Sequence, residues 1–590
     1  MQDPNEYYSR RLTELKAEKK KLSGQLFRYS LLRLLVFLSV LFALYFFYGE
    51  VQLLIGLGLL ALVVFVFLVM RFNHLQFQKQ KCDALIQLNE TELAALKGDY
   101  LQLAEGAEYE DGEHHFSRDI DLFGVGSFFQ YINRTALTEG KNILAKWLMS
   151  NHNEQLVLKQ EAIKELRDAP EWRQEYTAIA AMVSTEATPS QLSKWFREYQ
   201  PILNGRFKII PLAFGLISLA LIAAYLINAL SGWSLFFWFL AGLGISGFYL
   251  KRINRLAVLS ANALDTFQQF HKLIHLLETT SFNAELLTQK QVIFNNDEEA
   301  VSRSVRKFAD ILHAFDQRNN MLIGILGNGF LLLDLYQTYR IEHWIQKHGE
   351  EVNSWFEVLG YFDACNSLGN FAFNHPAYVF PELSADSIVI KAEGAGHPLL
   401  DKESRVTNDF LIREHDFHII TGANMAGKST FLRTVSLLIV MANTGLPVCA
   451  TSMRYKPIKL VTSMRTADSL TRHESYFFSE LKRLKFIVEE MAKDRYFIVL
   501  DEILKGTNST DKAQGSRQFL DRLVASKSTG LIATHDLSLC SAAKAYGQVS
   551  NYYFDAEIVK GELHFDYQLK PGICQNMNAS FLLKKLKIVE

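Results

Sequence analysis

Two pairs of long apolar segments interrupt a chain that otherwise mixes hydrophobic and polar positions. Residues 30–48 and 51–70 are apolar around the whole circumference of a helix, and a two-residue turn separates them. Residues 209–229 and 233–250 form a second pair with the same layout. Since about 20 apolar residues in a helix match the hydrocarbon core of a bilayer, each pair predicts a transmembrane helical hairpin. The alternative is a hairpin buried in a large helical domain, although soluble helices seldom stay apolar on every face for this length.

Basic residues flank the open ends of both predicted hairpins, whereas both turns lack Lys and Arg. By the positive-inside rule this asymmetry predicts a multi-pass protein of the inner (cytoplasmic) membrane, with both termini and all large segments in the cytoplasm. The flanking basic residues are Lys19, Lys20, Lys21, Arg28 and Arg33 before the first span, Arg71, Lys79 and Lys81 after the second, Arg206 and Lys208 before the third, and Lys251, Arg252 and Arg255 after the fourth.

The remaining pattern divides the chain near residue 385. Residues 71–204 and 251–384 carry charges and apolar residues at helical spacing, which predicts amphipathic helices of an all-α region, the segment 323–333 included. From about residue 385 onward, short β-branched runs alternate with helical stretches, which predicts an α/β domain with a mainly parallel sheet over 385–590. The predicted strands include residues 388–390, 417–420, 460–461, 497–500 and 531–532.

Composition restricts the class of protein. Hydrophobic residues make up 49% of the chain and charged residues 21%, which excludes a disordered or collagen-like protein. Lys and Arg total 62 against 63 for Asp and Glu, so any contact with nucleic acid requires a local basic patch. The five cysteines are scattered and form no C-x-x-C pair, which predicts free thiols in a reducing compartment and no cysteine metal site.

The candidate chemistry begins at the end of a predicted strand of the α/β domain. Residues 422–429 fit the pattern G-x-x-x-x-G-K-[ST] of a phosphate-binding P-loop, between a strand and a helix as that motif requires. In this arrangement backbone N–H groups and the helix N-terminus converge on a polyphosphate, Lys428 neutralises the β- and γ-phosphate oxygens, and the Ser429 hydroxyl binds Mg²⁺. The predicted nucleotide-binding residues are Gly422, Ala423, Asn424, Met425, Ala426, Gly427, Lys428, Ser429 and Thr430.

Two further strand ends supply the groups that hydrolysis needs. An apolar strand runs into Asp501 and Glu502, a Walker B arrangement in which Asp501 holds Mg²⁺ through water and Glu502 polarises the attacking water. A later buried strand ends at His535, a position from which a histidine reaches the γ-phosphate. These residues predict a Mg²⁺-dependent ATP hydrolase with Lys428, Glu502 and His535 as its catalytic groups.

Taken together, these motifs resemble the MutS family of mismatch-repair ATPases. Residues 421–430 (TGANMAGKST) are similar to the family's phosphate loop, including an Asn-Met pair that generic P-loops lack, and residues 500–506 (LDEILKG) to its Walker B segment. Residues 475–480 (SYFFSE) resemble its signature segment, and a stretch from about residue 119 resembles the opening of its helical core. Further positions that match family motifs are Gly396, His397, Pro398, Asn408, Asp409, Arg465, Asp468, Thr507, Asp511, Gly515 and the run 567–572.

The resemblance implies an ABC-type ATPase domain that uses ATP and Mg²⁺. It also implies a homodimer with composite sites, in which Ser475 of one subunit completes the nucleotide site of the other. DNA is the implied partner, mismatched or otherwise structured, bound by helical arms that open and close like a clamp. The chain departs from the family at Ala423, where proline is usual, and at 1–110, which shows no mismatch-reading domain and no Phe-x-Glu wedge.

The resulting domain organisation combines the pattern and the resemblance. It consists of a basic N-terminal helix at 1–28, a transmembrane hairpin at 29–70, a cytoplasmic helical region at 71–204, a second hairpin at 205–250, a helical core or lever region at 251–384 and a MutS-like ATPase domain at 385–590.

Two other functions compete with this interpretation. A transporter of the ABC type also joins membrane spans to a P-loop ATPase, but it requires an L-S-G-G-Q-like signature between the phosphate loop and Walker B. The similar string LSGQ at 22–25 lies far upstream of both. A membrane-tethered mechanical ATPase that acts on a protein partner remains the alternative to DNA binding.

Overall fold

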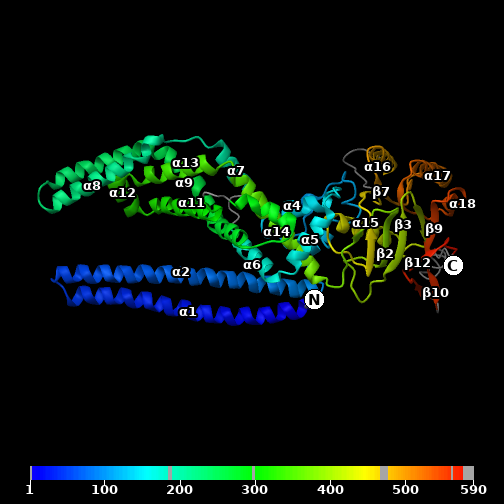
Figure 1. The fold of residues 1–590 in the computed structure, drawn as a ribbon, viewed down its shortest axis with the longest axis horizontal. Helices are drawn as coiled ribbons and strands as arrows, with labels where there is room; N and C mark the ends of the chain where they lie inside the picture. The colour runs from blue at the N-terminus through cyan, green and yellow to red at the C-terminus, as the bar shows by residue number, and fades with distance from the viewer. Residues whose placement is uncertain (1–2, 184–188, 296–298, 466–475, 560–561, 576–590) are drawn as a thin grey trace, which may run out of the picture.

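The computed structural model of the protein describes residues 3–183, 189–295, 299–465, 476–559 and 562–575. The molecule is elongated, with an α/β domain at one end and two helical arms that extend toward the other (Figure 1). A helical junction connects the arms to the α/β domain. The predicted order, a helical region followed by an α/β region, is confirmed.

The first arm is a single antiparallel helical hairpin. α1 (Pro4–Phe46) and α2 (Val51–Leu96) both continue well beyond the apolar segments predicted from the sequence. Toward the junction, the two helices pack along a shared apolar seam. The buried side chains of this seam include Leu15, Leu22, Leu75, Cys82, Leu85 and Ile86.

The second arm is a helical bundle. Its elements are α7 (Pro189–Glu198), η2 (Gly205–Lys208), α8 (Ile210–Leu226), α9 (Gly232–Thr279), α11 (Val301–Asp316), α12 (Met321–Leu331) and α13 (Leu333–His348). The short helix α10 (Glu285–Gln291), which follows α9, packs against the junction instead. α8 and the first half of α9 form the second predicted hairpin. The rest of the bundle has an aromatic core, in which Phe308 stacks on Trp344 with 3.9 Å between ring centroids and Phe267 packs edge-on against both.

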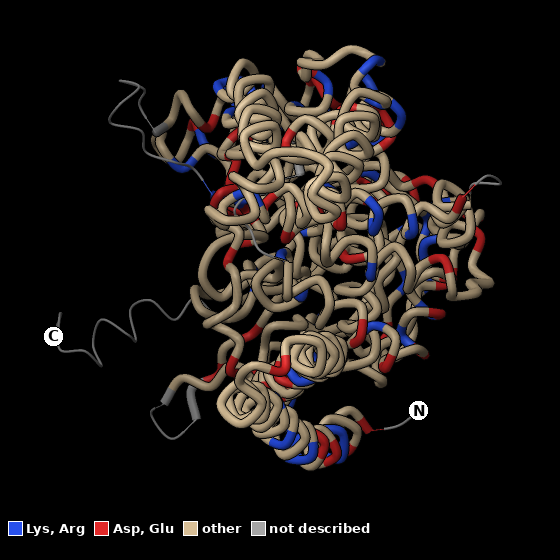
Figure 2. The backbone as a smooth tube through the Cα atoms, turned by 90° about the vertical axis from the view of Figure 1, so that its left-hand side faces the viewer, with Lys and Arg blue, Asp and Glu red and all other residues tan. Residues whose placement is uncertain are grey.

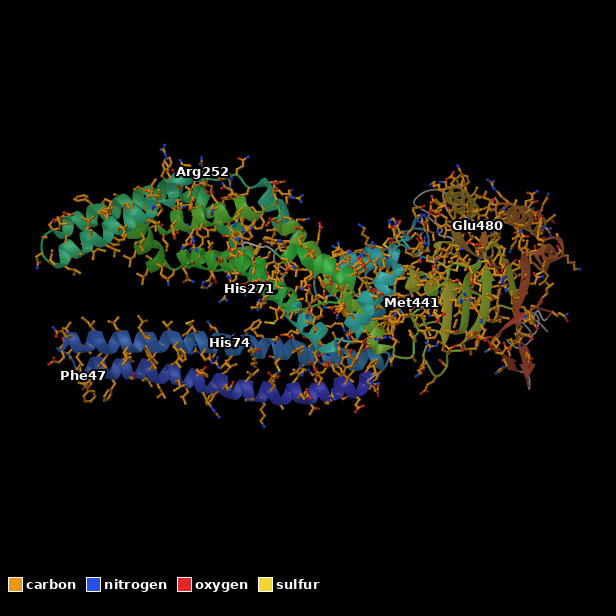
Figure 3. All side chains as sticks on the ribbon, in the orientation of Figure 1. Phe47, His74, Arg252, His271, Met441 and Glu480 are labelled. Atoms are coloured by element: carbon orange, nitrogen blue, oxygen red, sulfur yellow. The ribbon has the colours of Figure 1, made fainter. Side chains whose placement is uncertain are left out.

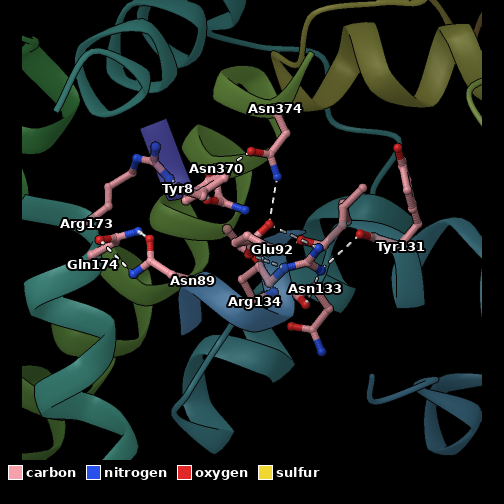
Figure 4. A network of polar contacts seen from close by, with 12 residues as sticks. Tyr8, Asn89, Glu92, Tyr131, Asn133, Arg134, Arg173, Gln174, Asn370 and Asn374 are labelled. Carbon is pink, nitrogen blue, oxygen red and sulfur yellow. Dashed lines mark hydrogen bonds and ion pairs between the residues drawn. The ribbon is translucent and has the colours of Figure 1, made fainter. Parts of the chain in front are cut away.

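The junction is built around α14 (Val352–Asn374), which is buried along most of its length. It packs against α4 (Thr138–Met149), α5 (Leu156–Arg167) and α6 (Pro170–Ala181). Near the C-terminal end of α14, polar side chains from both helices of the first arm meet side chains of the junction, including the segment after α3 (Phe128–Ile132) (Figure 4).

A buried carboxylate lies at the centre of this polar network. Glu92 of α2 accepts hydrogen bonds from Arg134 Nε (2.6 Å) and Asn374 Nδ2 (2.7 Å). The Tyr8 hydroxyl of α1 donates to Asn374 Oδ1 (2.8 Å). The first arm is therefore fixed to the junction by buried hydrogen bonds from both of its helices (Figure 4).

The α/β domain contains two main sheets. The larger sheet has the strand order β12-β9-β4-β8-β7-β6, in which β12 is antiparallel to its neighbour and the other pairs are parallel. α15 (Lys428–Thr444) covers one face, and α16 (Tyr476–Met491) and α17 (Ser509–Ala525) cover the other. The strands of this sheet are β4 (Phe417–Gly422), β6 (Lys459–Ser463), β7 (Tyr496–Asp501), β8 (Thr529–Ala533), β9 (Val549–Phe554) and β12 (Leu569–Pro571).

The smaller sheet has the order β1-β5-β2-β3. Its strands are β1 (Glu382–Leu383), β2 (Ile388–Ala395), β3 (Asn408–Arg413) and β5 (Ser452–Tyr455); a short ribbon of β10 (Glu557–Val559) and β11 (Glu562–His564) and the helix α18 (Ala542–Ala545) complete the domain. The predicted strands at 417–420, 460–461, 497–500 and 531–532 lie within β4, β6, β7 and β8, so the mainly parallel sheet is confirmed for the larger sheet. The predicted strand at 388–390 lies within β2, which pairs antiparallel with β3 and β5 in the smaller sheet.

The apolar helices of both arms are exposed. Four helical segments in the described ranges are long and apolar enough to cross a membrane: Pro4–Phe46, Val51–Leu96, Gly205–Leu226 and Gly232–Ala261. Their most apolar stretches are at most 22% buried. This exposure contradicts the alternative of a hairpin buried in a helical core, because soluble monomers rarely expose contiguous apolar surfaces of this extent.

The two hairpins extend in the same direction, away from the α/β domain. Phe47, at the tip of the first hairpin, lies at the far end of the molecule (Figure 3). His74 and Arg252, just beyond the apolar stretches of the first and second hairpins, lie at similar positions along the long axis (Figure 3). The apolar stretches of the two hairpins therefore end at a similar level along that axis.

Residues 323–333 are helical, as predicted, but they differ from the expected amphipathic helix. They form most of α12 and the start of α13, and α12 packs on α8 and α9 with apolar side chains exposed. The difference has a local cause: the small and polar residues Gly327, Asn328 and Gly329 face the protein, which turns the larger apolar side chains outward.

Candidate nucleotide-binding site

The predicted P-loop connects β4 to α15 at the carboxyl edge of the larger sheet. Gly422 and Gly427 adopt φ values of +148° and +106°, which favour glycine. A Cβ atom at Gly422 would lie 2.6 Å from the carbonyl oxygen of Phe554 on the adjacent strand. The close approach of these two strands therefore requires glycine at the entry to the loop.

Lys428 lies at the start of α15 with its side chain directed into the loop. The Nζ atom donates hydrogen bonds to the carbonyl oxygens of Gly422 (2.8 Å) and Ala423 (2.9 Å). Burial lowers the pKa of Lys428 to about 8. Because a nearby anion favours the charged form of a lysine, a bound phosphate would counteract this effect of burial and be neutralised in turn.

Ser429 and Asp501 bring two oxygen ligands together. The Ser429 hydroxyl donates to Asp501 Oδ2 (2.6 Å), so the helix start and the end of β7 meet at this point. Mg²⁺ prefers oxygen ligands and is usually held by one or two carboxylates together with substrate phosphates and water. The pair fits such a shared site, and the described residues contain no separate cluster of three or more His, Cys, Asp or Glu side chains that could hold a metal.

Glu502 and His535 form the next contact. Glu502 Oε1 lies 2.6 Å from His535 Nε2, which is itself 3.4 Å from Lys428 Nζ. Burial and the charge of Lys428 lower the pKa of His535. A proton on Nε2 at this distance would be donated to the Glu502 carboxylate. Glu502 has a φ of +51°, and its N–H donates to the Ala533 carbonyl oxygen of the neighbouring strand (2.9 Å). This backbone conformation directs the carboxylate toward the loop.

These side chains line one cavity of about 630 Å³. The predicted residues in its lining are Ala423, Asn424, Met425, Gly427, Lys428, Ser429, Thr430, Asp501, Glu502 and His535. Gly422 and Ala426 do not line the cavity; Ala426 is fully buried beneath the loop. The structure therefore brings together the phosphate-binding, metal-binding and catalytic groups expected from separate motifs.

Sequence reasoning assigned no binding role to the other wall of the cavity. That wall includes Ala395, Gly396, His397, Leu400, Ser404, Val406, Asn408, Phe554 and Tyr567. Asn408 Nδ2 donates to the Tyr567 carbonyl oxygen (3.0 Å), and Asn408 Oδ1 accepts from Leu569 N–H (2.6 Å). Asn408 therefore holds the segment before β12 against the P-loop. The motif matches at Gly396, His397, Asn408 and Tyr567 were the available sequence signal for this wall.

Only part of the signature segment lies within the residues that the structure describes. Asp468 and Ser475 lie outside the described residues, so the predicted contact of Ser475 stays a prediction. On the N-terminal side, the Asp119 carboxylate accepts the backbone N–H groups of Met464 (3.1 Å) and Arg465 (2.9 Å). No motif marked Asp119, because its partners are distant in sequence.

On the C-terminal side of the signature segment, α16 begins at Tyr476. Glu480 of this helix accepts the backbone N–H groups of Leu504 (2.6 Å) and Lys505 (3.0 Å). These two residues lie two and three positions after Glu502. Glu480 therefore fixes the loop after Walker B to the helix that follows the signature segment.

Comparison with known proteins identifies the domain that carries this site. A family model described as MutS domain V matches residues 418–585. The match includes the P-loop, the Walker B residues and His535. The C-terminal part of the chain is therefore a domain of the MutS family.

Curated relatives align with the chain over part of their length. The chain is 30% identical over 255 residues to MutS protein homolog 4 of Homo sapiens, which covers 41% of the chain and 26% of that relative. It is 30% identical to DNA mismatch repair protein MSH4 of Arabidopsis thaliana (39% and 30% covered) and to DNA mismatch repair protein MutS of Aquifex pyrophilus (40% and 28% covered). The chain thus spans between a quarter and a third of the length of these relatives.

Proposed function

We propose that this protein is a membrane-anchored, Mg²⁺-dependent ATPase that acts as a homodimer and uses its nucleotide cycle to open and close its helical arms around DNA. The observation that carries the ATPase part is the convergence of Lys428, Ser429, Asp501, Glu502 and His535 in one cavity. A metal-binding aspartate beside a second carboxylate suits hydrolysis, because the second carboxylate polarises the attacking water. The MutS domain V supports the same activity.

In the proposed reaction, each group has one task. Backbone N–H groups of the loop and Lys428 bind the phosphates, while Ser429 and Asp501 would hold Mg²⁺, which neutralises developing charge on the phosphate oxygens. Glu502 receives the proton of the attacking water. His535, hydrogen-bonded to Glu502, orients that carboxylate. Each site is completed in the dimer by the partner's signature segment.

DNA as the partner is supported by the names of the relatives, two of which are called DNA mismatch repair proteins. Charges of both signs are interspersed over the molecule when it is viewed along its long axis (Figure 2). Since neutralisation of DNA phosphates by Lys and Arg dominates DNA affinity, contact requires a local patch on the arms or the junction.

A specific observation favours a protein partner as the second candidate. Basic side chains of the first arm pair with acidic neighbours: Lys16 with Glu90 (2.9 Å), Lys19 with Asp83 (2.7 Å) and Lys81 with Glu175 (2.8 Å). Paired charges contribute little to phosphate binding, and the tips of both arms are apolar. Arms with this surface suit a mechanical ATPase that moves a protein partner at the membrane.

We expect the solubilised full-length protein to hydrolyse ATP with Mg²⁺ and to lose this activity in EDTA. Under the DNA proposal, homoduplex, mismatched or branched DNA binds with an affinity that falls steeply with salt, and at least one of them changes the ATPase rate. The measurement is steady-state ATPase activity with each DNA, together with DNA binding at two salt concentrations. ATP hydrolysis that no DNA alters, without salt-dependent binding, would reject the DNA partner and favour the protein partner, while absence of hydrolysis would reject the ATPase itself.

Membrane anchoring is the remaining part of the proposal, and it rests on the exposed apolar hairpins and their basic flanks. Cysteine labels placed at Glu50 or Ser231, in the two turns, are expected to react with membrane-impermeant reagents from outside the cell. A reporter fused after Glu590 is expected to be cytoplasmic. Extraction of the full-length protein from membranes by carbonate or high salt would contradict integral insertion.

A further inference from the structure

α12 exposes an apolar surface that the four predicted spans do not account for. Its sequence, MLIGILGNGFL, contains no charged residue. Met321 and Leu322 expose 76% and 71% of their surface, and Leu326 exposes 53%. At about 1.5 Å per residue, its 11 residues reach roughly half the thickness of a bilayer core, so α12 alone is too short to span one.

The protein-facing side of α12 is packed tightly against the second hairpin. A Cβ atom at Gly242 of α9 would overlap the carbonyl oxygen of Gly329, and one at Gly329 would overlap the ring of Phe239. Near the middle of α8, the Ser218 hydroxyl donates to the Phe330 carbonyl oxygen (2.6 Å). Small residues and interhelical hydrogen bonds of this kind are typical of helix packing inside membranes.

α12 ends at a sharp bend, where a buried side chain forms hydrogen bonds with backbone polar groups. α12 and α13 meet at an angle of 86°, at Leu332 with a φ of +51°. Asn328 Oδ1 accepts the backbone N–H of Asp334 (2.9 Å), and Asn328 Nδ2 donates to the Gly324 carbonyl oxygen (2.9 Å). Irregular backbone is tolerated at membrane depth only where its polar groups have such partners.

Charged groups mark the level at which α12 begins. Arg318, just before α12, pairs with Asp334 (3.0 Å) and donates to Asn254 Oδ1 (2.8 Å). Asn254 lies among the exposed basic residues Lys251, Arg252 and Arg255, which follow the apolar half of α9. Basic side chains at this level suit the phosphate groups of lipids.

We propose that α12 is a re-entrant helix, which enters the cytoplasmic leaflet beside the second hairpin and leaves on the same side, with Leu322 and Leu326 in contact with lipid acyl chains. This inference rests on the proposed membrane anchoring. The bilayer is the occupant because the exposed face of α12 is continuous with the exposed apolar faces of α8 and α9, on which α12 packs. α12 would thereby add a membrane contact to the second arm, and α13 connects α12 to the rest of that arm.

Fluorescence quenching by lipids tests this placement. Single cysteines at Leu326 and, independently, Leu322 are labelled with the fluorophore NBD in full-length protein in phosphatidylcholine–phosphatidylglycerol vesicles; the native cysteines are buried. Leu219, exposed in the middle of α8, is the control inside the membrane, and Val125, exposed in a loop near the α/β domain, is the control in water. Nitroxide groups on carbon 5 or carbon 12 of the acyl chains report depth.

The labels at Leu326 and Leu322 are expected to be quenched within about twofold of the Leu219 label and several-fold more than the Val125 label. Quenching at Leu326 should be stronger with the carbon-5 nitroxide, and at Leu219 with the carbon-12 nitroxide, because α12 stays in one leaflet. Quenching at Leu219 without quenching at Leu322 and Leu326 would overturn the proposal and leave the anchoring intact. Disulfide cross-linking of two copies through Leu326→Cys, without lipid quenching, would show a protein interface instead. Loss of quenching at Leu219 as well would overturn the anchoring together with the proposal.

Discussion

Glu502→Gln is expected to bind ATP normally and to hydrolyse it about 10²–10⁴-fold more slowly than the parent protein. Glutamine keeps the size of the side chain and can accept the hydrogen bond from His535, but it cannot take the proton of the attacking water. The substitution therefore destabilises the transition state of hydrolysis and leaves the affinity for ATP unchanged. Steady-state ATPase rates and equilibrium binding of a fluorescent ATP analogue separate the two effects.

Lys428→Ala is the complementary variant, and it is expected to lose nucleotide affinity itself. The Nζ atom lies among loop carbonyl oxygens, where it would meet the phosphates in the ground state. Glu489→Gln and Lys485→Ala, at exposed positions on α16 that do not line the cavity, are matched controls that should behave like the parent. Equal ATP turnover by Glu502→Gln and the parent protein would reject the role assigned to Glu502.

The nucleotide site could be predicted from sequence because its parts are local. The P-loop needs particular glycines between a strand and a helix. Asp501 is the last residue of β7, and His535 lies two residues after the end of β8. Parallel strands place their carboxyl ends at one edge of a sheet, so residues after separate strands meet there. The structure places these groups in one cavity, as that rule requires.

Contacts between distant segments could not be predicted in this way. Asp119 holds the strand end before the signature segment, yet nothing in its own neighbourhood distinguishes it from a surface carboxylate. The sequence shows that α12 is apolar, but it does not show which face of α12 is packed. Gly329 selects the packed face only because Phe239 and Gly242 lie opposite it. The spacing of apolar residues along a helix shows which residues share a face, but it does not show what packs against each face.

The attachment of the first arm to the junction gives the second large prediction. Burial alone would raise the pKa of Glu92, but the Arg134 guanidinium and the amides of Asn370 and Asn374 hold that pKa below its usual value. Glu92→Ala leaves the buried Arg134 cation without its charge partner and Asn374 Nδ2 without its acceptor. Removing one member of a buried ion pair typically costs about 3–5 kcal/mol. We therefore expect amide hydrogen exchange near the C-terminal end of α14 to accelerate by about two to three orders of magnitude, since each 1.4 kcal/mol is about tenfold.

Glu90→Ala, two residues away on the same helix, is the matched control. Glu90 pairs with Lys16 at the surface, and such exposed pairs contribute about 0–1 kcal/mol, so exchange in α14 should change by less than about fivefold.

Because the pKa of Glu92 is lowered by folding, its stabilisation is complete above the unfolded-state pKa of about 4.3 and is lost as the pH falls through the folded-state value. Exchange in the parent protein, corrected for the intrinsic effect of pH, should therefore approach that of Glu92→Ala in acid. Similar exchange in α14 of the Glu90→Ala and Glu92→Ala variants at neutral pH would mean that the buried network does not hold the arm to the junction.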